Sequence, residues 1–124
     1  METSYNNKSG HIGGSLSLIQ VLSYLLFYQS RKNKLWKIIL SKGHSSLGLY
    51  SLFETLKLEK NLLNRYCLIP EGLHGHTCSK ASKYILASTG SLGHGLPIAA
   101  GYSYAIKKLN KPNITLCVIG DGDL

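Results

Sequence analysis

The sequence predicts an α/β fold in which short parallel strands alternate with helices. Residues 114–119 have the apolar, β-branched composition of a buried parallel strand, and residues 35–40 form a second apolar run short enough for a strand. Before and between these runs, apolar residues recur at the three- and four-residue spacing of helices. At the end of the chain, a helical pattern, a turn and a strand follow one another, which is half of a repeating α/β unit.

The length of 124 residues allows one domain at most. The last strand leads into Gly-Asp-Gly without a following helix, whereas such a strand normally continues into structure that covers the sheet. We therefore expect residues 1–124 to be a fragment, a single partial domain.

Charge and cysteine content limit the classes of partner and compartment. The net charge is +8, but the basic residues are spread and no nucleic-acid-reading module accompanies them, so no nucleic-acid partner is expected. The 3 cysteines show no paired spacing, which is typical of free thiols in a reducing compartment. The chain start lacks a signal-peptide core, and the apolar stretch 16–28 is too short to span a bilayer. We expect a cytoplasmic protein without membrane contact.

The elements are expected in the following order. Residues 1–14 form a glycine-rich loop, and Ser17 with Gln20 has the capping-box pattern that opens a helix from about residue 18 to residue 28. The apolar residues of this helix nearly encircle it and so predict burial. The remaining elements are a strand at 35–40, a helix at 47–58, a short helix at 60–66, an irregular region at 71–83, a helix at 96–109, a turn at 110–113 and a strand from 114.

The stretch Gly120-Asp121-Gly122 is the first candidate site. Open α/β sheets bind ligands at the carboxyl ends of their strands, and glycines on both sides of an acid allow a sharp turn there. A carboxylate next to free backbone N–H groups suits a hard cation that neutralises a phosphate. A plain strand-to-turn exit remains the alternative.

Histidines beside glycines form a second group of candidates. His11, His44, His76 and His94 each adjoin a glycine in a loop, where binding groups gather. The loop Gly90 to Gly95 precedes a helix and could present backbone N–H groups to a phosphate, although it matches neither the P-loop nor the dinucleotide pattern. A zinc site is a weaker alternative, because its candidate ligands lack the tight pairs of structural zinc sites; they are Cys67, His74, His76 and Cys78.

Five sequence blocks in order resemble the N-terminal, thiamine diphosphate-binding part of transketolase, most closely its split, two-subunit type. The blocks are Ser9-Gly10-His11-Ile12-Gly13-Gly14-Ser15-Leu16-Ser17, Ile39-Leu40-Ser41-Lys42-Gly43-His44-Ser45-Ser46, Gly75-His76, Ser88-Thr89-Gly90-Ser91-Leu92-Gly93-His94-Gly95-Leu96 and Gly120-Asp121-Gly122-Asp123-Leu124. Together they cover essentially the whole chain. The resemblance implies part of a doubly wound, mainly parallel sheet with flanking helices, the thiamine diphosphate-binding fold.

The resemblance also implies a role for particular residues. Asp121 matches the family's Mg²⁺ ligand, and His44 matches a histidine near the cofactor diphosphate. His11 and His76 match histidines of the substrate channel, which bind donor hydroxyls and help to move protons. The residues that would contact the cofactor are His44, Gly90, Ser91, Leu92 and Gly122.

The implied activity is transfer of a two-carbon ketol unit between sugar phosphates, with thiamine diphosphate and Mg²⁺ as cofactors. The implied partner is a C-terminal transketolase subunit or domain in a dimeric assembly, since the family's activating glutamate comes from another domain across the dimer interface. Two departures from the family pattern are Thr77 and Ile12, each where proline is usual. The alternatives are a non-catalytic remnant or partner module, and an enzyme similar to deoxyxylulose phosphate synthase.

Overall fold

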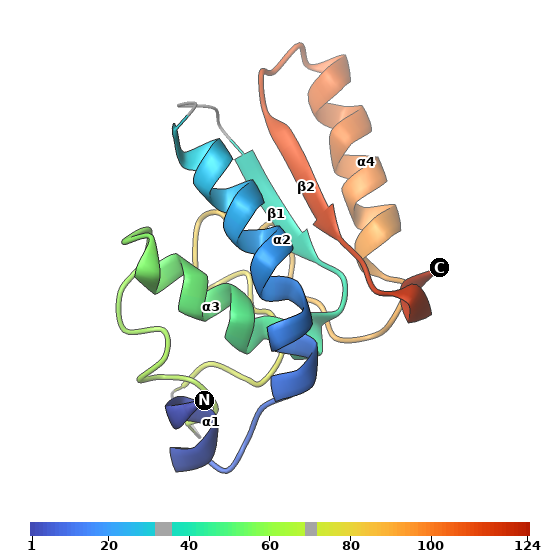
Figure 1. Cartoon of the computed structure of the whole chain (residues 1–124). Coiled ribbons are helices and arrows are strands. Elements are labelled where there is room, and N and C mark those ends of the chain that lie inside the picture. Colours follow the sequence, from blue (N-terminus) through green and yellow to red (C-terminus); the bar gives the residue numbers. More distant parts are fainter. Residues whose placement is uncertain (32–35, 69–71) are drawn as a thin grey trace.

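The computed structural model describes residues 1–31, 36–68 and 72–124, and a small parallel sheet lies at its centre (Figure 1). Strands β1 (Trp36–Leu40) and β2 (Ile114–Val118) pair in parallel over their full length, from Trp36 opposite Ile114 to Leu40 opposite Val118. Both predicted strands are thus confirmed, with Leu35 outside the described residues. The carboxyl ends of the two strands lie side by side.

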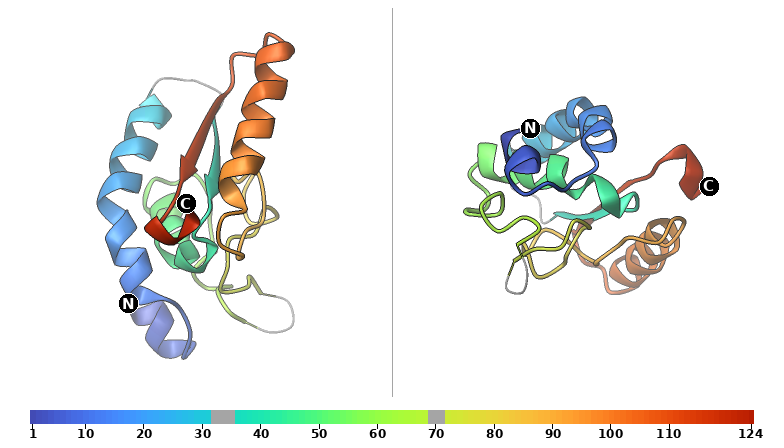
Figure 2. Two further views of the ribbon diagram at one scale, coloured as in Figure 1. Left: turned by 90° about the vertical axis from the view of Figure 1, so that its right-hand side faces the viewer. Right: turned by 90° about the horizontal axis from the view of Figure 1, so that it is seen from below.

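Helices cover both faces of this sheet. Helices α2 (Ile12–Arg31) and α3 (Ser46–Thr55) lie on one face, and α4 (Gly95–Lys108) lies on the other, where it contacts both strands (Figure 2). This arrangement confirms the predicted fold class, an α/β protein with a parallel sheet and flanking helices. Within the described parts of the chain, no helix is both long and apolar enough to cross a membrane.

The core lies between β1 and the helices α2 and α3. Leu22 and Leu26 of α2 and Ile38 of β1 are fully buried in one cluster with Phe53 of α3. The predicted burial of the second strand is wrong for most of its length, since only Val118 is buried in β2. The outer edge of β2 has no neighbouring strand among the described residues, and α4 is the helix with the main contact to this strand, so that its side chains are covered chiefly on one face.

The amino-terminal region differs from its prediction. A short helix, α1 (Glu2–Asn6), occupies part of the expected loop, and α2 begins at Ile12 rather than near residue 18. The Ser17 hydroxyl donates to the Gly14 carbonyl inside α2 at 2.8 Å, so the capping-box prediction is wrong. The prediction of a buried helix is also wrong for one face, where Tyr24 is 69% exposed.

Two further helix predictions need correction. Helix α3 ends at Thr55, because Lys57 adopts a positive φ of 56° that no helix accommodates. Residues 60–66 form turns instead of a helix, with Asn61 at φ 58° and the Leu63 N–H donating to the Glu54 carboxylate at 2.9 Å. The expected helix at 96–109 is confirmed as α4, one residue earlier at each end.

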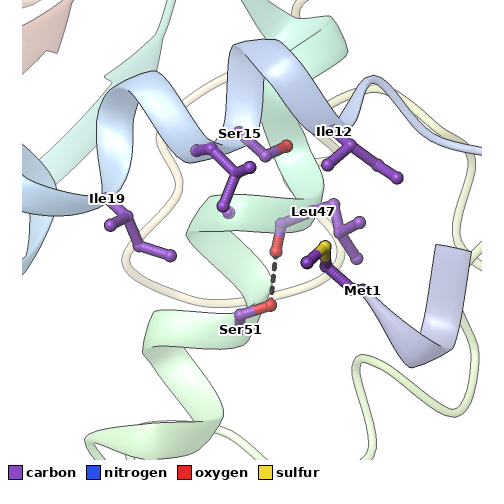
Figure 3. A pocket seen from close by; sticks show the side chains of 8 residues that line it. Met1, Ile12, Ser15, Ile19, Leu47 and Ser51 are labelled. Atoms are coloured by element: carbon purple, nitrogen blue, oxygen red, sulfur yellow. Dashed lines mark hydrogen bonds between the residues drawn. The ribbon is translucent and has the colours of Figure 1, made fainter.

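The start of α2 lies close against α3. A Cβ on Gly48 would come within 2.9 Å of the Ser15 carbonyl oxygen, so glycine permits this approach of the two backbones. A small apolar cavity of about 50 Å³ remains beside this contact (Figure 3), lined by Met1, Ile12, Ser15, Leu16, Ile19, Leu47, Gly48 and Ser51. This packing places the loop before α2 next to the loop after β1.

Candidate functional site

Two loops leave the carboxyl ends of the parallel strands at the same edge of the sheet. After β1 the chain runs through Ser41 and Lys42 into the short 3₁₀ turn η1 (Gly43–Ser45). After β2 it runs through Gly120 into the 3₁₀ turn η2 (Asp121–Asp123), near the carboxyl end of the chain in Figure 1. Gly120 is extended, with φ −101° and ψ 169°, and Gly122 does not have a positive φ either. The expectation that the two glycines provide a backbone conformation needed for a sharp turn is therefore wrong.

A cavity of about 180 Å³ opens between these loops and the loop before α4. Its lining brings together residues from three separate parts of the sequence: Lys42, His44, Leu92, Gly120, Asp121, Gly122 and Asp123. Four of the residues that the sequence marked for a cofactor or metal, His44, Leu92, Asp121 and Gly122, thus share one cavity. Gly90 and Ser91 do not line it.

Gly90 instead lies against a histidine. A Cβ on Gly90 would come within 3.2 Å of the His76 Cδ2 atom, so the absence of a side chain lets the imidazole pack there. Ser91 is exposed next to this contact.

Three of the candidate histidines form a cluster beside the cavity. The His11 and His44 ring centroids are 5.2 Å apart, and those of His11 and His76 are 6.2 Å apart. His94 lies apart from this cluster as the residue that caps α4, without a side-chain cap bond. The three rings come from loops that are distant in sequence, and His11 is the member that joins the other two.

The environment of His44 disfavours its protonated form. Partial burial is the largest cause, followed by the positive potential of His11, Lys42 and His76, and together they lower the pKa of His44 despite an opposing effect of Asp123. At neutral pH this imidazole is therefore neutral, with one nitrogen that donates and one that accepts a hydrogen bond.

Hydrogen bonds to buried residues fix the backbone of the segment that carries His76. The Thr77 N–H donates to the Gly43 carbonyl at 3.0 Å, and the Thr89 N–H donates to the Thr77 carbonyl at 3.1 Å. The Tyr50 hydroxyl accepts from the Cys78 N–H at 2.9 Å and donates to the His76 carbonyl at 3.3 Å. Thr77 stands where the family resemblance leads one to expect proline, and it supplies an N–H donor that proline lacks.

Asp123 is a residue of the site that the sequence reasoning did not single out. Its side chain is buried and accepts three hydrogen bonds, from the Ser41 hydroxyl (2.9 Å), the Gly93 N–H (2.9 Å) and the Gly120 N–H (2.7 Å). Burial alone would raise the pKa of Asp123, but these hydrogen bonds outweigh it and lower the pKa. A signal existed in the sequence, because an acid three residues after Gly120 can accept from the Gly120 N–H as the acid of a capping box does, although glycine supplies no side chain for the reciprocal bond.

The zinc alternative is not supported. Across the described ranges, no three His, Cys, Asp or Glu side chains lie close enough to hold one metal ion. Cys67 instead has the Ser9 hydroxyl as a hydrogen-bond partner at 3.1 Å, and all three cysteines are free thiols.

The cavity fits an anionic ligand with a hard cation. Asp121 is exposed and offers carboxylate oxygens, the ligands that Mg²⁺ prefers, and Lys42 and His44 line the same cavity. A Cβ on Gly122 would contact only Leu92, at 3.7 Å, so the backbone at this position faces open space. Fold and cavity together define an α/β protein with a cavity, lined by acidic and basic side chains, at the carboxyl ends of parallel strands, where open α/β sheets bind their ligands.

Comparison with known proteins agrees with this class. Residues 1–124 match the family described as transketolase, thiamine diphosphate binding domain, and the chain belongs to this family. It is 32% identical to a 6-deoxy-6-sulfo-D-fructose transketolase subunit of Clostridium sp. (strain MSTE9), covering 92% of this chain and 44% of the relative. It is also 32% identical to an apulose-4-phosphate transketolase subunit of Actinobacillus succinogenes, covering 93% and 45%.

A transketolase of Buchnera aphidicola is similar over a smaller share of its own length. It is 33% identical, covering 94% of this chain and 20% of the relative. The chain thus spans less than half the length of these curated relatives.

Proposed function

We propose that this chain is the thiamine diphosphate-binding part of a transketolase that transfers a two-carbon ketol unit between sugar phosphates with Mg²⁺ as second cofactor. The observation that carries the proposal is the single cavity that joins His44, Leu92, Asp121 and Gly122. We further propose that residues 1–124 form part of one such domain. The family membership and the two relatives named as transketolase subunits support it.

The residues at the cavity have complementary tasks in this proposal. Asp121 would hold Mg²⁺, and the exposed backbone at Gly122 and the neutral His44 would hold the diphosphate. The loop of Gly90, Ser91 and Leu92 would contact the cofactor, and Leu92 itself lines the cavity.

When bound, thiamine diphosphate supplies the electron sink that makes cleavage of a carbon–carbon bond beside a carbonyl feasible. His11 and His76 would bind hydroxyl groups of the sugar and hold or move protons there, which is supported by their exposure and by the ring contacts of His11 with both His44 and His76. Gly90 lets the His76 ring take up its place.

A C-terminal transketolase subunit or domain completes the enzyme in this proposal, within a dimeric assembly. The Clostridium and Actinobacillus relatives are both described as subunits, which supports a partner for this chain as well. Purified protein mixed with a candidate C-terminal subunit should catalyse ketol transfer between sugar phosphates. Cofactor binding without transfer in any such mixture would favour a non-catalytic partner module instead.

The metal assignment is tested by titration with thiamine diphosphate and Mg²⁺, followed by calorimetry. Asp121→Asn removes the charge of the proposed metal ligand and should weaken binding by tenfold or more, because the cation that would neutralise the diphosphate is then held less tightly. Glu2→Gln, which removes one exposed negative charge from α1, is the matched control and should bind as the unmodified protein does. Equal affinity of Asp121→Asn and the control would refute the assignment.

A further inference from the structure

The side chain of Asp123 is the point at which three segments of the site meet. Its Oδ1 atom accepts hydrogen bonds from Ser41, directly after β1, and from Gly93, in the loop before α4. Its Oδ2 atom accepts from the Gly120 N–H, directly after β2. One carboxylate therefore joins the strand ends to the loop that carries Leu92.

The chemistry of these contacts requires a carboxylate. All three partners donate, and an ionised carboxylate is the side chain that accepts at both oxygens without presenting a donor. The Ser41 hydroxyl extends the connection, since it donates to Asp123 and accepts from the N–H of Gly95 at 3.1 Å, at the start of α4. Asp123 is 6% exposed, so water does not readily replace these partners.

These bonds set the position of the neighbouring cavity residues. Asp121 and Gly122 lie in the turn that is closed by Gly120 at one end and Asp123 at the other, and the Asp123 N–H donates to the Gly120 carbonyl at 3.1 Å. Leu92 directly precedes Gly93, whose N–H is bound by Asp123, and Gly93 has a positive φ of 78°. A shift of the Asp123 carboxylate would move both walls of the cavity.

We propose that Asp123 is a positioning residue that fixes the turn carrying Asp121 against the Leu92 loop, and so sets the affinity of the cavity for a diphosphate with its divalent cation. This inference rests on the proposed function, in which the same cavity binds thiamine diphosphate and the metal. Asp123 also lines the cavity, but both of its carboxylate oxygens are bound to donors of the protein, which are the Ser41 hydroxyl and the N–H groups of Gly93 and Gly120.

The test measures binding of thiamine diphosphate with Mn²⁺ to the complete protein, by calorimetry and by the electron paramagnetic resonance signal of free Mn²⁺. Asp123→Ala removes all three bonds and should weaken binding by about ten- to a hundredfold, the usual cost of losing groups that orient a metal ligand. Asp123→Asn keeps an oxygen for Ser41 and Gly93 but turns an NH₂ group toward the Gly120 N–H. It should show a smaller loss.

A double-mutant cycle separates positioning from stability alone. If Ser41 acts through Asp123, Ser41→Ala should weaken binding less in the Asp123→Ala background than in the unmodified protein. Melting curves identify variants that do not fold; should Asp123→Ala be one, Asp123→Asn and Ser41→Ala carry the same test. A role limited to stability would lower the melting temperature and leave the affinity unchanged, which would overturn the proposal.

The controls distinguish this proposal from the function on which it rests. If Asp121→Asn loses the ligand while folded Asp123 variants bind within threefold of the unmodified protein, the proposed function stands and the positioning role is refuted. If the unmodified protein binds neither thiamine diphosphate nor Mn²⁺, both are refuted.

Discussion

Replacing Tyr50 by phenylalanine should destabilise the protein by about 2 kcal/mol. Tyr50 is fully buried, and burial raises the pKa of its phenol above the usual value, so the hydroxyl stays protonated and can donate while it accepts. Phenylalanine removes the acceptor of the Cys78 N–H at 2.9 Å and the donor to the His76 carbonyl at 3.3 Å. A lost hydrogen bond costs about 1 kcal/mol, and a buried group left without a partner costs about 1–3 kcal/mol.

Urea denaturation of the complete protein measures this loss as a change in the free energy of unfolding. Tyr104→Phe is the matched control, because Tyr104 is 64% exposed on α4 and its substitution should change the free energy by less than about 0.5 kcal/mol. If Tyr50→Phe behaved like this control, the two hydrogen bonds would not hold the His76 segment and the reasoning would be wrong.

Three further predictions concern the loops around the site. Thr77→Pro removes the N–H that binds the Gly43 carbonyl and should cost about 1 kcal/mol or more in urea denaturation, whereas Thr77→Val keeps that bond and should cost less. Gly43→Ala should lower the free energy of unfolding by about 1–3 kcal/mol in thermal unfolding, since the new Cβ would lie 2.5 Å from the Thr89 carbonyl oxygen. Gly101→Ala is the control in α4, where a Cβ would meet nothing within 4 Å, and it should raise the free energy of unfolding by about 0.5–1 kcal/mol. Because the folded state lowers the pKa of His44, the unfolded state binds more protons, and stability should rise with pH up to and slightly above 6.5, the ordinary value. His44→Gln should flatten this part of a stability–pH profile, and an unchanged profile would contradict the assignment.

Strand ends were the part of the site that the sequence could predict. Apolar runs identified both strands, and the rule that ligands bind at strand carboxyl ends pointed to Asp121, which lines the cavity together with His44. The place of His11 beside His44 followed from no local pattern, because it depends on the packing of α2 against α3. The family resemblance marked His11, and the structure shows the cluster that it joins.

The start of α2 shows why local patterns failed elsewhere. Gly13 and Gly14 are poor helix formers, and so the prediction placed them in a loop. A Cβ on Gly14 would come within 2.5 Å of the Ser45 hydroxyl, which means that glycine is needed there for packing against η1. Tertiary contact outweighs helix propensity at this position, and such a contact cannot be read from neighbouring residues.

The orientation of the sheet has a practical consequence for labelling the protein. Both strands begin at the end remote from the cavity, so the turn that joins α4 to β2 lies at the opposite end of the sheet (Figure 1). Lys111 is exposed in this turn. A fluorophore attached there, through Lys111→Cys in a background without the native cysteines, would report on the tumbling of the protein and on its assembly with a partner, and would lie away from the cavity.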